Sequence, residues 1–318
     1  MSAPDAYRPA LHRYALAVAA ATGALLFIGG LVTSTGSALA VPDWPLSFGK
    51  LFPRMTGGVL FEHGHRLVAA TVGLLTVLLA VWLWRAESRR WVRWLGAGAL
   101  AAVVLQGVLG GITVLLRLPV AVAVAHAGLA EIFFCLTVTI ALVTGPGWIA
   151  APAPSAEQRR PSLRVLSAVT VVAVYLQILA GALVRHTGAG LAIPDFPLAF
   201  GRLWPGTAST LVAYQLVHRA GAVVATVMVL WTAGTVLRRH ADVPALLRPA
   251  TVQVLLLAFQ IYLGATIIWT RRAVIPTTTH VLCGALVLAT SLVVALRAAR
   301  HLAPRSPDRS SAPASTAA

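Results

Sequence analysis

Long hydrophobic runs separated by short polar segments dominate this sequence. Eight runs are long enough to cross a membrane, because about 20 apolar residues span the ~30 Å of hydrocarbon in a bilayer. Charged residues are sparse inside these runs and gather between them. The pattern predicts an all-α integral membrane protein with eight transmembrane helices, at approximately 14–33, 59–84, 94–116, 119–144, 165–185, 211–237, 249–269 and 274–297.

Composition and charge support this class and define a topology. Hydrophobic residues make up 58% of the 318 residues and charged residues 11%, which excludes an ordinary soluble domain. If the N-terminus is cytoplasmic, 16 lysines and arginines fall in inner segments and seven in outer segments: Lys50, Arg54, Arg117, Arg185, Arg202, Arg271 and Arg272. The positive-inside rule therefore predicts the cell inner (plasma) membrane with both termini cytoplasmic. The net charge of +16 reflects this topology and does not require a nucleic-acid partner.

The N-terminus also has features of a secretory signal. Basic residues precede an apolar stretch, and the small-residue sequence Ala38-Leu39-Ala40 follows it. We expect no cleavage, because the stretch is long for a signal and a matching segment recurs in mid-chain.

An internal repeat divides the chain into two halves. Residues 31–53 and 183–205 are identical at 14 of 23 positions at an offset of 152. Such self-similarity indicates duplication. The repeat covers four helices, so both copies enter the membrane in the same orientation. We predict two tandem, pseudo-twofold-related four-helix bundles. Their bounds are 1–148 and 164–300, with a cytoplasmic linker at 149–163 and a disordered tail at 301–318.

Both copies contain a proline-bracketed turn in a long outer loop. Pro42-Asp43-Trp44-Pro45 corresponds to Pro194-Asp195-Phe196-Pro197. Two prolines around an acid and an aromatic residue cannot continue a helix and favour a fixed turn. Such a loop is either a lid over a site or a duplicated structural turn.

Four of the nine histidines lie inside apolar segments, where ionisable residues usually mark function. His65, His126, His218 and His280 are each six or seven residues into an even-numbered helix, which is ~10 Å below the outer end at 1.5 Å per residue. A haem iron takes two imidazoles level with one another across a bundle. We predict haem-iron pairs within each half, rather than satisfied core histidines or a zinc site, which requires more ligands. Four of the other five histidines lie in outer or cytoplasmic segments and are expected at the surface: His12, His186, His240 and His301.

The two halves differ beside the second-helix histidine. Glu62 and His65 share a helix face at i, i+3, whereas the copy has Gln215 in place of the acid. A carboxylate near a haem can take or deliver protons, so Glu62 is a candidate catalytic residue. The alternative is an ion pair between Glu62 and Arg66. Arg66 and its copy Arg219 could also neutralise haem propionates.

Two further titratable side chains lie within the predicted helices. His63 is ~200° around the helix from His65 and has no histidine counterpart, so we do not expect it to bind iron. Glu131 is replaced by Ala285 in the repeat, and we assign it no role.

Taken together, these features resemble the haem A synthase family (the CtaA/Cox15 proteins). The resemblance covers most of residues 13–298. It rests on Glu62-x-x-His65-Arg66, its copy His218-Arg219, the histidines of the fourth and eighth helices, and the loops TGSALAVPDWPLSFG and TGAGLAIPDFPLAFG.

The family resemblance implies oxidation of a methyl group of haem O to a formyl group, giving haem A for terminal oxidase assembly. It also implies that His218 and His280 hold a haem b cofactor. His65 and His126 would bind the substrate haem O, with Glu62 in catalysis. An electron partner is implied but not identified. A contact with the enzyme that makes haem O and a homo-oligomer are left open.

One feature departs from the pattern of some family members, which carry a cysteine pair in each long outer loop. Val41 and Ser47, and Ile193 and Ala199, occupy those places here. The only two cysteines fall inside the fourth and eighth helices, so a loop disulfide is excluded.

Two other functions compete with haem A synthesis. A di-haem b-type protein could pass electrons from quinol without modifying either haem. A transporter or haem carrier is less compatible, because the repeats are parallel and the helices lack broken midplane segments.

Overall fold

The computed structural model describes residues 7–157, 160–203, 205 and 209–303. Within this part of the chain, eight long apolar helices confirm the predicted all-helical, multi-pass membrane class. They are α1 (Pro9–Ser34), α2 (Gly58–Ala86), α3 (Arg90–Leu115), α4 (Val120–Val143), α6 (Leu163–His186), α7 (Thr210–Arg239), α8 (Pro244–Trp269) and α9 (Val274–His301). The short elements are α5 (Pro146–Ile149), the 3-10 helix η1 (Ala189–Leu191), β1 (Ser155–Ala156) and β2 (Leu302–Ala303).

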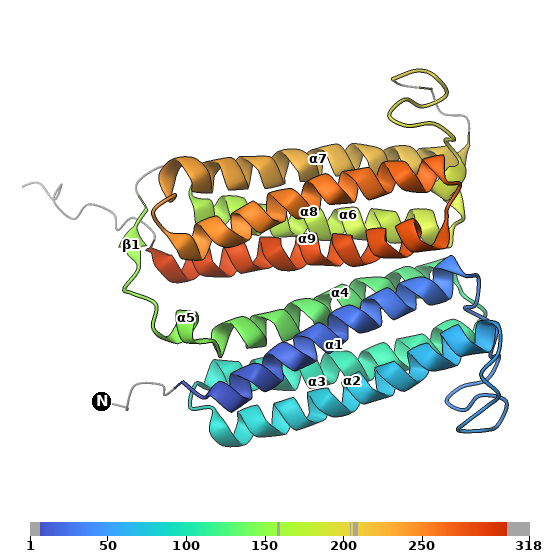
Figure 1. Ribbon diagram of the computed structural model, residues 1–318, viewed down its shortest axis with the longest axis horizontal. Helices are drawn as coiled ribbons and strands as arrows, with labels where there is room; N and C mark the ends of the chain where they lie inside the picture. Colours follow the sequence, from blue (N-terminus) through green and yellow to red (C-terminus); the bar gives the residue numbers. More distant parts are fainter. Residues whose placement is uncertain (1–6, 158–159, 204, 206–208, 304–318) are drawn as a thin grey trace, which may run out of the picture.

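The eight helices form two groups of four (Figure 1). In each group the helices pack in order, and the fourth returns to the first, so that α1 contacts α4 and α6 contacts α9. The two groups meet through α1, α4, α6 and α9. The sequential groups agree with a repeat of four helices.

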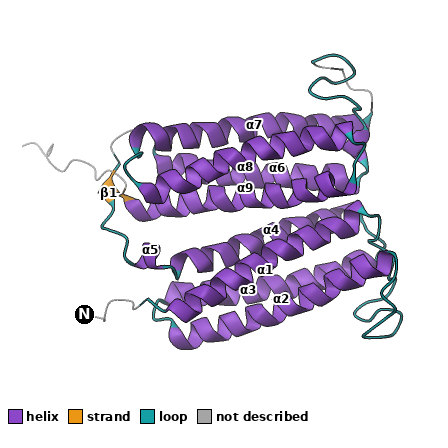
Figure 2. Ribbon diagram, viewed as in Figure 1, coloured by secondary structure: helices purple, strands orange, loops and turns teal. Residues whose placement is uncertain are grey.

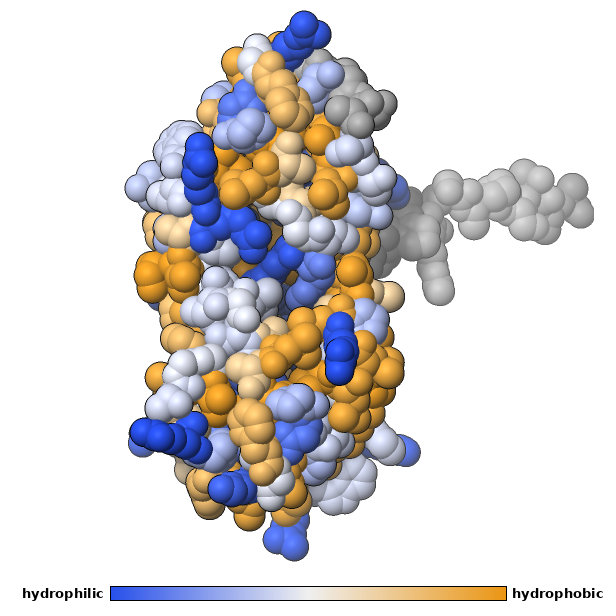
Figure 3. Space-filling model, turned by 90° about the vertical axis from the view of Figure 1, so that its right-hand side faces the viewer, coloured by the Kyte–Doolittle hydropathy of each residue, from blue (hydrophilic) through white to orange (hydrophobic). Residues whose placement is uncertain are grey.

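The described parts of the two long loops lie at the same end of the molecule, which we call the loop end (Figure 1). The first loop comprises residues 35–57 and the second loop residues 187–209. Figure 1 shows α5, β1 and the start of α1 at the opposite end. The space-filling view of the loop end shows hydrophilic residues among hydrophobic ones, including along the seam between the two groups (Figure 3).

Large apolar side chains cover the outside of the helices. Leu74, Val104, Leu176 and Leu255 are each more than half exposed. A surface of this kind is costly in water but matches the hydrocarbon core of a bilayer. The eight-span arrangement therefore explains both the buried and the exposed apolar residues.

Several helices extend beyond the apolar runs that predicted them. α1 begins at Pro9 and α8 at Pro244, each about five residues before the predicted start. Proline is favoured in the first helical turn, and a helix can continue past the hydrocarbon into the polar headgroup region. Hydrophobicity therefore identified these helices but not their full length.

Two segments that the sequence assigned to the linker and the tail pair with each other. Ser155 and Ala156 in the linker form a two-residue parallel pairing with Leu302 and Ala303 (Figure 2). The rest of the predicted tail, residues 304–318, lies outside the described residues.

Candidate functional site

The four intramembrane histidines lie on four different helices. His65 is on α2, His126 on α4, His218 on α7 and His280 on α9, and all four are half-buried. Within each half, the two rings are close enough for a charge on one to act on the other. That each pair binds a haem iron stays a prediction.

Each of these histidine rings faces a glycine on the preceding helix. A Cβ added to Gly29 or Gly181 would lie 3.1 Å from the His65 ring and 3.0 Å from the His218 ring, respectively. Added to Gly110 or Gly264, it would lie 3.3 Å from the ring of His126 or His280. Four matched contacts of this kind mean that each imidazole lies against a neighbouring helix where no side chain intervenes.

Glutamines contact three of the four rings. The amide nitrogens of Gln106 and Gln260 lie 3.4 and 3.3 Å from Nε2 of His126 and His280. The amide nitrogen of Gln177 on α6 lies 3.0 Å from Nδ1 of His218 and donates to the His218 carbonyl at 2.9 Å.

His65 has no glutamine at the corresponding position of the preceding helix. The position on α1 that corresponds to Gln177 is Leu25, which has no hydrogen-bonding group. The sequence analysis did not identify this difference, although aligning the repeats at the offset of 152 reveals it.

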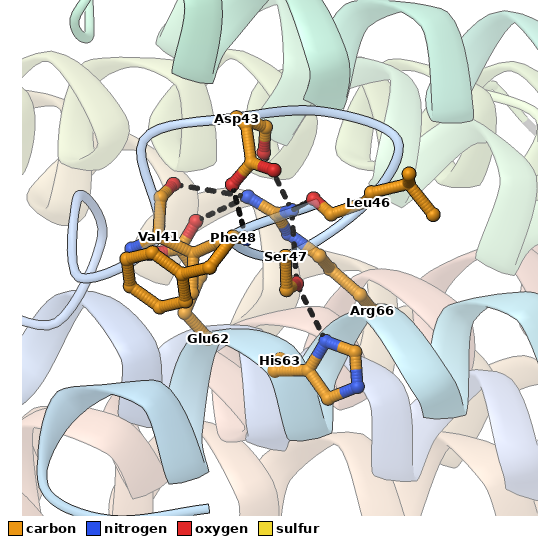
Figure 4. A network of polar contacts seen from close by, with 8 residues as sticks. All are labelled: Val41, Asp43, Leu46, Ser47, Phe48, Glu62, His63 and Arg66. Atoms are coloured by element: carbon orange, nitrogen blue, oxygen red, sulfur yellow. Dashed lines mark hydrogen bonds and ion pairs between the residues drawn. The ribbon is translucent and has the colours of Figure 1, made fainter. Parts of the chain in front are cut away.

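Glu62 and Arg66 at the loop end of α2 bind the first loop (Figure 4). Glu62 accepts hydrogen bonds from the backbone N–H of Val41 at 2.8 Å and from Arg66 at 2.7 Å. Arg66 also donates to the carbonyl groups of Asp43 and Leu46, at 2.7 and 2.8 Å. The candidate catalytic acid therefore also anchors a loop.

The second half repeats this anchor with an amide. Gln215 accepts from the N–H of Ile193 at 2.6 Å, in the manner of Glu62. Arg219 donates to the carbonyl groups of Asp195 and Leu198, at 2.6 and 2.7 Å. Both arginines thus contact loop carbonyl groups, a set of partners that the sequence analysis did not predict.

The aspartate present in each loop closes a turn. The carboxylate of Asp43 accepts from the N–H groups of Gly49 and Phe48, and the bond from Gly49 contributes most to holding its pKa below the ordinary value of 3.8. Asp195 forms the equivalent bonds in the second loop, with the same effect on its pKa. Gly49 adopts a positive φ of 69°, which glycine tolerates without strain.

The aromatic residue of each turn packs against the third helix of its half. A Cβ added to Gly111 on α3 would lie only 2.7 Å from Trp44, so the indole occupies the space of a missing side chain. Phe196 instead packs edge-on against Trp269 of α8, at 6.4 Å between ring centroids. Its half has Ala265 in the place of Gly111. The half with the larger aromatic ring, Trp44, therefore has the smaller helix residue, Gly111.

Other titratable groups lie outside these contacts. Glu131 is 4% exposed, and one of its carboxyl oxygens has no hydrogen-bond partner in the described residues. His186, which was expected at the surface, is half-buried at the end of α6 and lies within electrostatic range of His126. In the described ranges, no group of three or more His, Cys, Asp or Glu side chains is arranged to hold a metal ion.

Comparisons with known proteins agree with one another. A model of the COX15-CtaA family, described as a cytochrome oxidase assembly protein, matches residues 55–292. A heme A synthase from Symbiobacterium thermophilum is 35% identical over 264 residues, which is 80% of this chain and 85% of the relative. A heme A synthase from Geobacillus kaustophilus is 30% identical over 291 residues, which is 88% of this chain and 91% of the relative.

Proposed function

The chain belongs to the COX15-CtaA family of haem A synthases, and we propose that its two halves have different tasks in the reaction. A haem A synthase is an oxidoreductase that converts haem O to haem A. In this proposal the first half, α1–α4, binds the substrate haem O. The second half, α6–α9, holds a haem b cofactor.

The residues of the second half fit a haem b. His218 and His280 would be its iron ligands, since their rings lie within range of each other and each faces a glycine. Such a haem supplies one-electron transfer when bound. Hydrogen bonds from outer partners fix the orientation of metal-ligating histidines. Gln177 supports the assignment of the resident haem to this half, because His218 has that partner and His65 does not.

His65 and His126 would bind the iron of the substrate in the first half. A ligand ring without a glutamine partner is less strongly oriented, which suits a haem that must arrive and leave. Arg66 and Arg219, which we had considered for haem propionates, would act as loop anchors through the carbonyl contacts described above.

The substitution of Glu62 by Gln215 between the halves is the observation that carries this division. Both side chains accept a hydrogen bond from the loop, at 2.8 and 2.6 Å, so loop anchoring does not require an acid. At this position only the first half has a side chain that can gain or lose a proton. Glu62 would therefore take up a proton released as the substrate methyl is oxidised, while Arg66 orients its carboxylate.

Orientation and partners follow from the charge distribution and the chemistry. The termini would be cytoplasmic and the long loops on the outer side of the inner membrane. Oxidation of the substrate requires an electron partner, whose identity the sequence does not define.

Replacing Glu62 by glutamine tests the proposal. This variant reproduces the second half, so the loop contact should survive while haem A formation falls by on the order of 100-fold or more. Bound haem b should be unchanged in the optical spectrum of the purified protein. His218→Ala should instead deplete haem b.

The reciprocal variant Gln215→Glu is the matched control and should retain haem A formation. Equal loss of haem b in Glu62→Gln and His218→Ala would contradict the division of tasks. Full haem A formation by Glu62→Gln would contradict the role of the acid.

A further inference from the structure

Two buried polar side chains connect the first loop to α2. Ser47 is fully buried and His63 is 5% exposed, and the Ser47 hydroxyl lies 2.7 Å from Nδ1 of the His63 ring (Figure 4). Arg66 is 3.4 Å from the same hydroxyl. His63 thus holds the loop from the helix face opposite to His65.

The second half has an apolar pair at the same two positions. Ala199 corresponds to Ser47 and Leu216 to His63. Ala199 and Leu216 are 3% and 8% exposed, and belong to one hydrophobic cluster with Ile193 and Val212. Both members of the pair therefore differ between the halves in the same sense, from polar to apolar.

The polar pair is only partly satisfied. Nε2 of His63 is buried and has no hydrogen-bond partner in the described residues. An unpaired buried nitrogen opposes the closed state, because opening the loop would let water reach it. The apolar pair carries no such penalty, and withdrawing Leu216 from its cluster would lose hydrophobic burial. The first loop is therefore held less firmly than the second at this point.

The first loop contacts residues that are sequence neighbours of the predicted substrate site. Arg66, which binds three loop carbonyl groups, directly follows His65 on α2. Trp44 packs on Gly111, the neighbour of the glycine that faces His126. Movement of the loop would uncover the helix ends next to both histidines.

We propose that His63 and Ser47 are positioning residues that make the first loop releasable, so that haem O can reach His65 and His126 and haem A can leave. Leu216 and Ala199 keep the second loop closed over a haem that stays. This inference rests on the proposed division of tasks between the halves. It concerns access to the first site, not the oxidation itself.

Two variants of the full chain, purified with haem b, test this inference by hydrogen exchange at the amides of residues 41–50. Ser47→Ala removes the hydrogen bond and leaves His63 unpaired, so exchange should become several-fold faster. The double variant Ser47→Ala with His63→Leu installs the pair of the second half. Its exchange should become on the order of 10-fold slower than in the unaltered protein.

The opposite sign of the two effects is the critical result. If the polar pair served only for stability, both variants would loosen the loop, and that outcome would overturn the inference. Unchanged exchange in Ser47→Ala would also overturn the inference. If the double variant loses haem b, the exchange rate of Ser47→Ala alone tests the inference. Ser47→Thr keeps a hydroxyl and should restore normal exchange.

Kinetics provide a second readout of the double variant. Conversion of haem O that is already bound should be retained in a single turnover, while steady-state formation of haem A falls about 10-fold because release slows. Equal loss in both measurements would assign His63 to the chemistry instead. The exchange experiment needs no haem O, so its failure is distinguishable from failure of the Glu62 and His218 tests.

Discussion

The contact between Gly181 and His218 allows a direct test of the proposed haem b site. A Cβ at position 181 would lie 3.0 Å from Cε1, 3.4 Å from Nδ1 and 3.9 Å from Nε2 of the ring. Carbon atoms in favourable contact are roughly 3.5–4.0 Å apart. Gly181→Ala would therefore require the imidazole to move by about 0.5 Å.

A displacement of this size matters for a metal ligand. Ligand distances must usually be met within about 0.2 Å, and disturbing the surroundings of a ligand typically costs 10–100-fold in metal affinity. Gln177 holds the same ring and its carbonyl group, which limits how far His218 can adjust. We expect haem b affinity to fall by on the order of 10-fold. The helix itself should not suffer, because alanine is favoured over glycine by ~1 kcal/mol in a helix interior.

The assay is the haem b content and haem release rate of the purified protein, followed by absorbance. Gly107→Ala on α3 is the matched control, because an added Cβ there meets no described atom within 4 Å. Gly110→Ala, whose Cβ would lie 3.3 Å from His126, should reduce haem A formation but leave haem b in place. Normal haem b retention in Gly181→Ala, or equal loss in Gly107→Ala, would refute the reasoning.

Two other contacts yield predictions. Gln177→Leu removes the hydrogen bonds at His218, so haem b should transfer to an acceptor globin about 10-fold faster; an unchanged rate would show that the amide does not orient the ligand. Gly111→Ala places a methyl group 2.7 Å from Trp44 and should lower haem A formation several-fold. Adding Trp44→Phe should recover most of that activity, since the second half combines phenylalanine with alanine, and no recovery would show that the two positions are uncoupled.

Helix number and histidine depth could be predicted from the sequence because both depend on distance along the chain. A run of about 20 apolar residues in a membrane protein forms a transmembrane helix. Residues at equal distances along parallel helices lie at equal depth in the membrane. The eight spans followed from this argument. The same argument placed His65 with His126 and His218 with His280, but it could not supply the partners on neighbouring helices.

Those partners depend on how each helix is rotated about its axis, which the hydrophobic pattern defined weakly. Nothing in the sequence distinguished Gly181, which faces a histidine, from Gly107, which faces open space. Arg66 was considered for haem propionates because it follows His65. The sequence did not indicate that its side chain would donate to carbonyl groups of the first loop, which need donors.

His63 shows where the sequence contained a signal that was not used. We set it aside because the second half has no histidine at that position. Its contact is with Ser47, however, and both positions change together, to Leu216 and Ala199. A paired change between repeats indicates a contact more reliably than either change alone.

The features shared by the halves cannot account for the proposed difference in their tasks, so the differences between the halves must. Both halves have two intramembrane histidines that face glycines, an arginine that donates to loop carbonyl groups and an aspartate that closes the turn. Three of the differences near these elements have the same direction. At the first, the first half has an ionisable side chain and the second half a neutral one. At the second, a polar pair holds the first loop less firmly than an apolar pair holds the second loop. At the third, the first half has no glutamine where the second half has one beside its histidine. These are Glu62 against Gln215, His63 with Ser47 against Leu216 with Ala199, and Leu25 against Gln177. In the proposed division of tasks, the first set belongs to a site that reacts and exchanges its haem, and the second set to a site that keeps its haem.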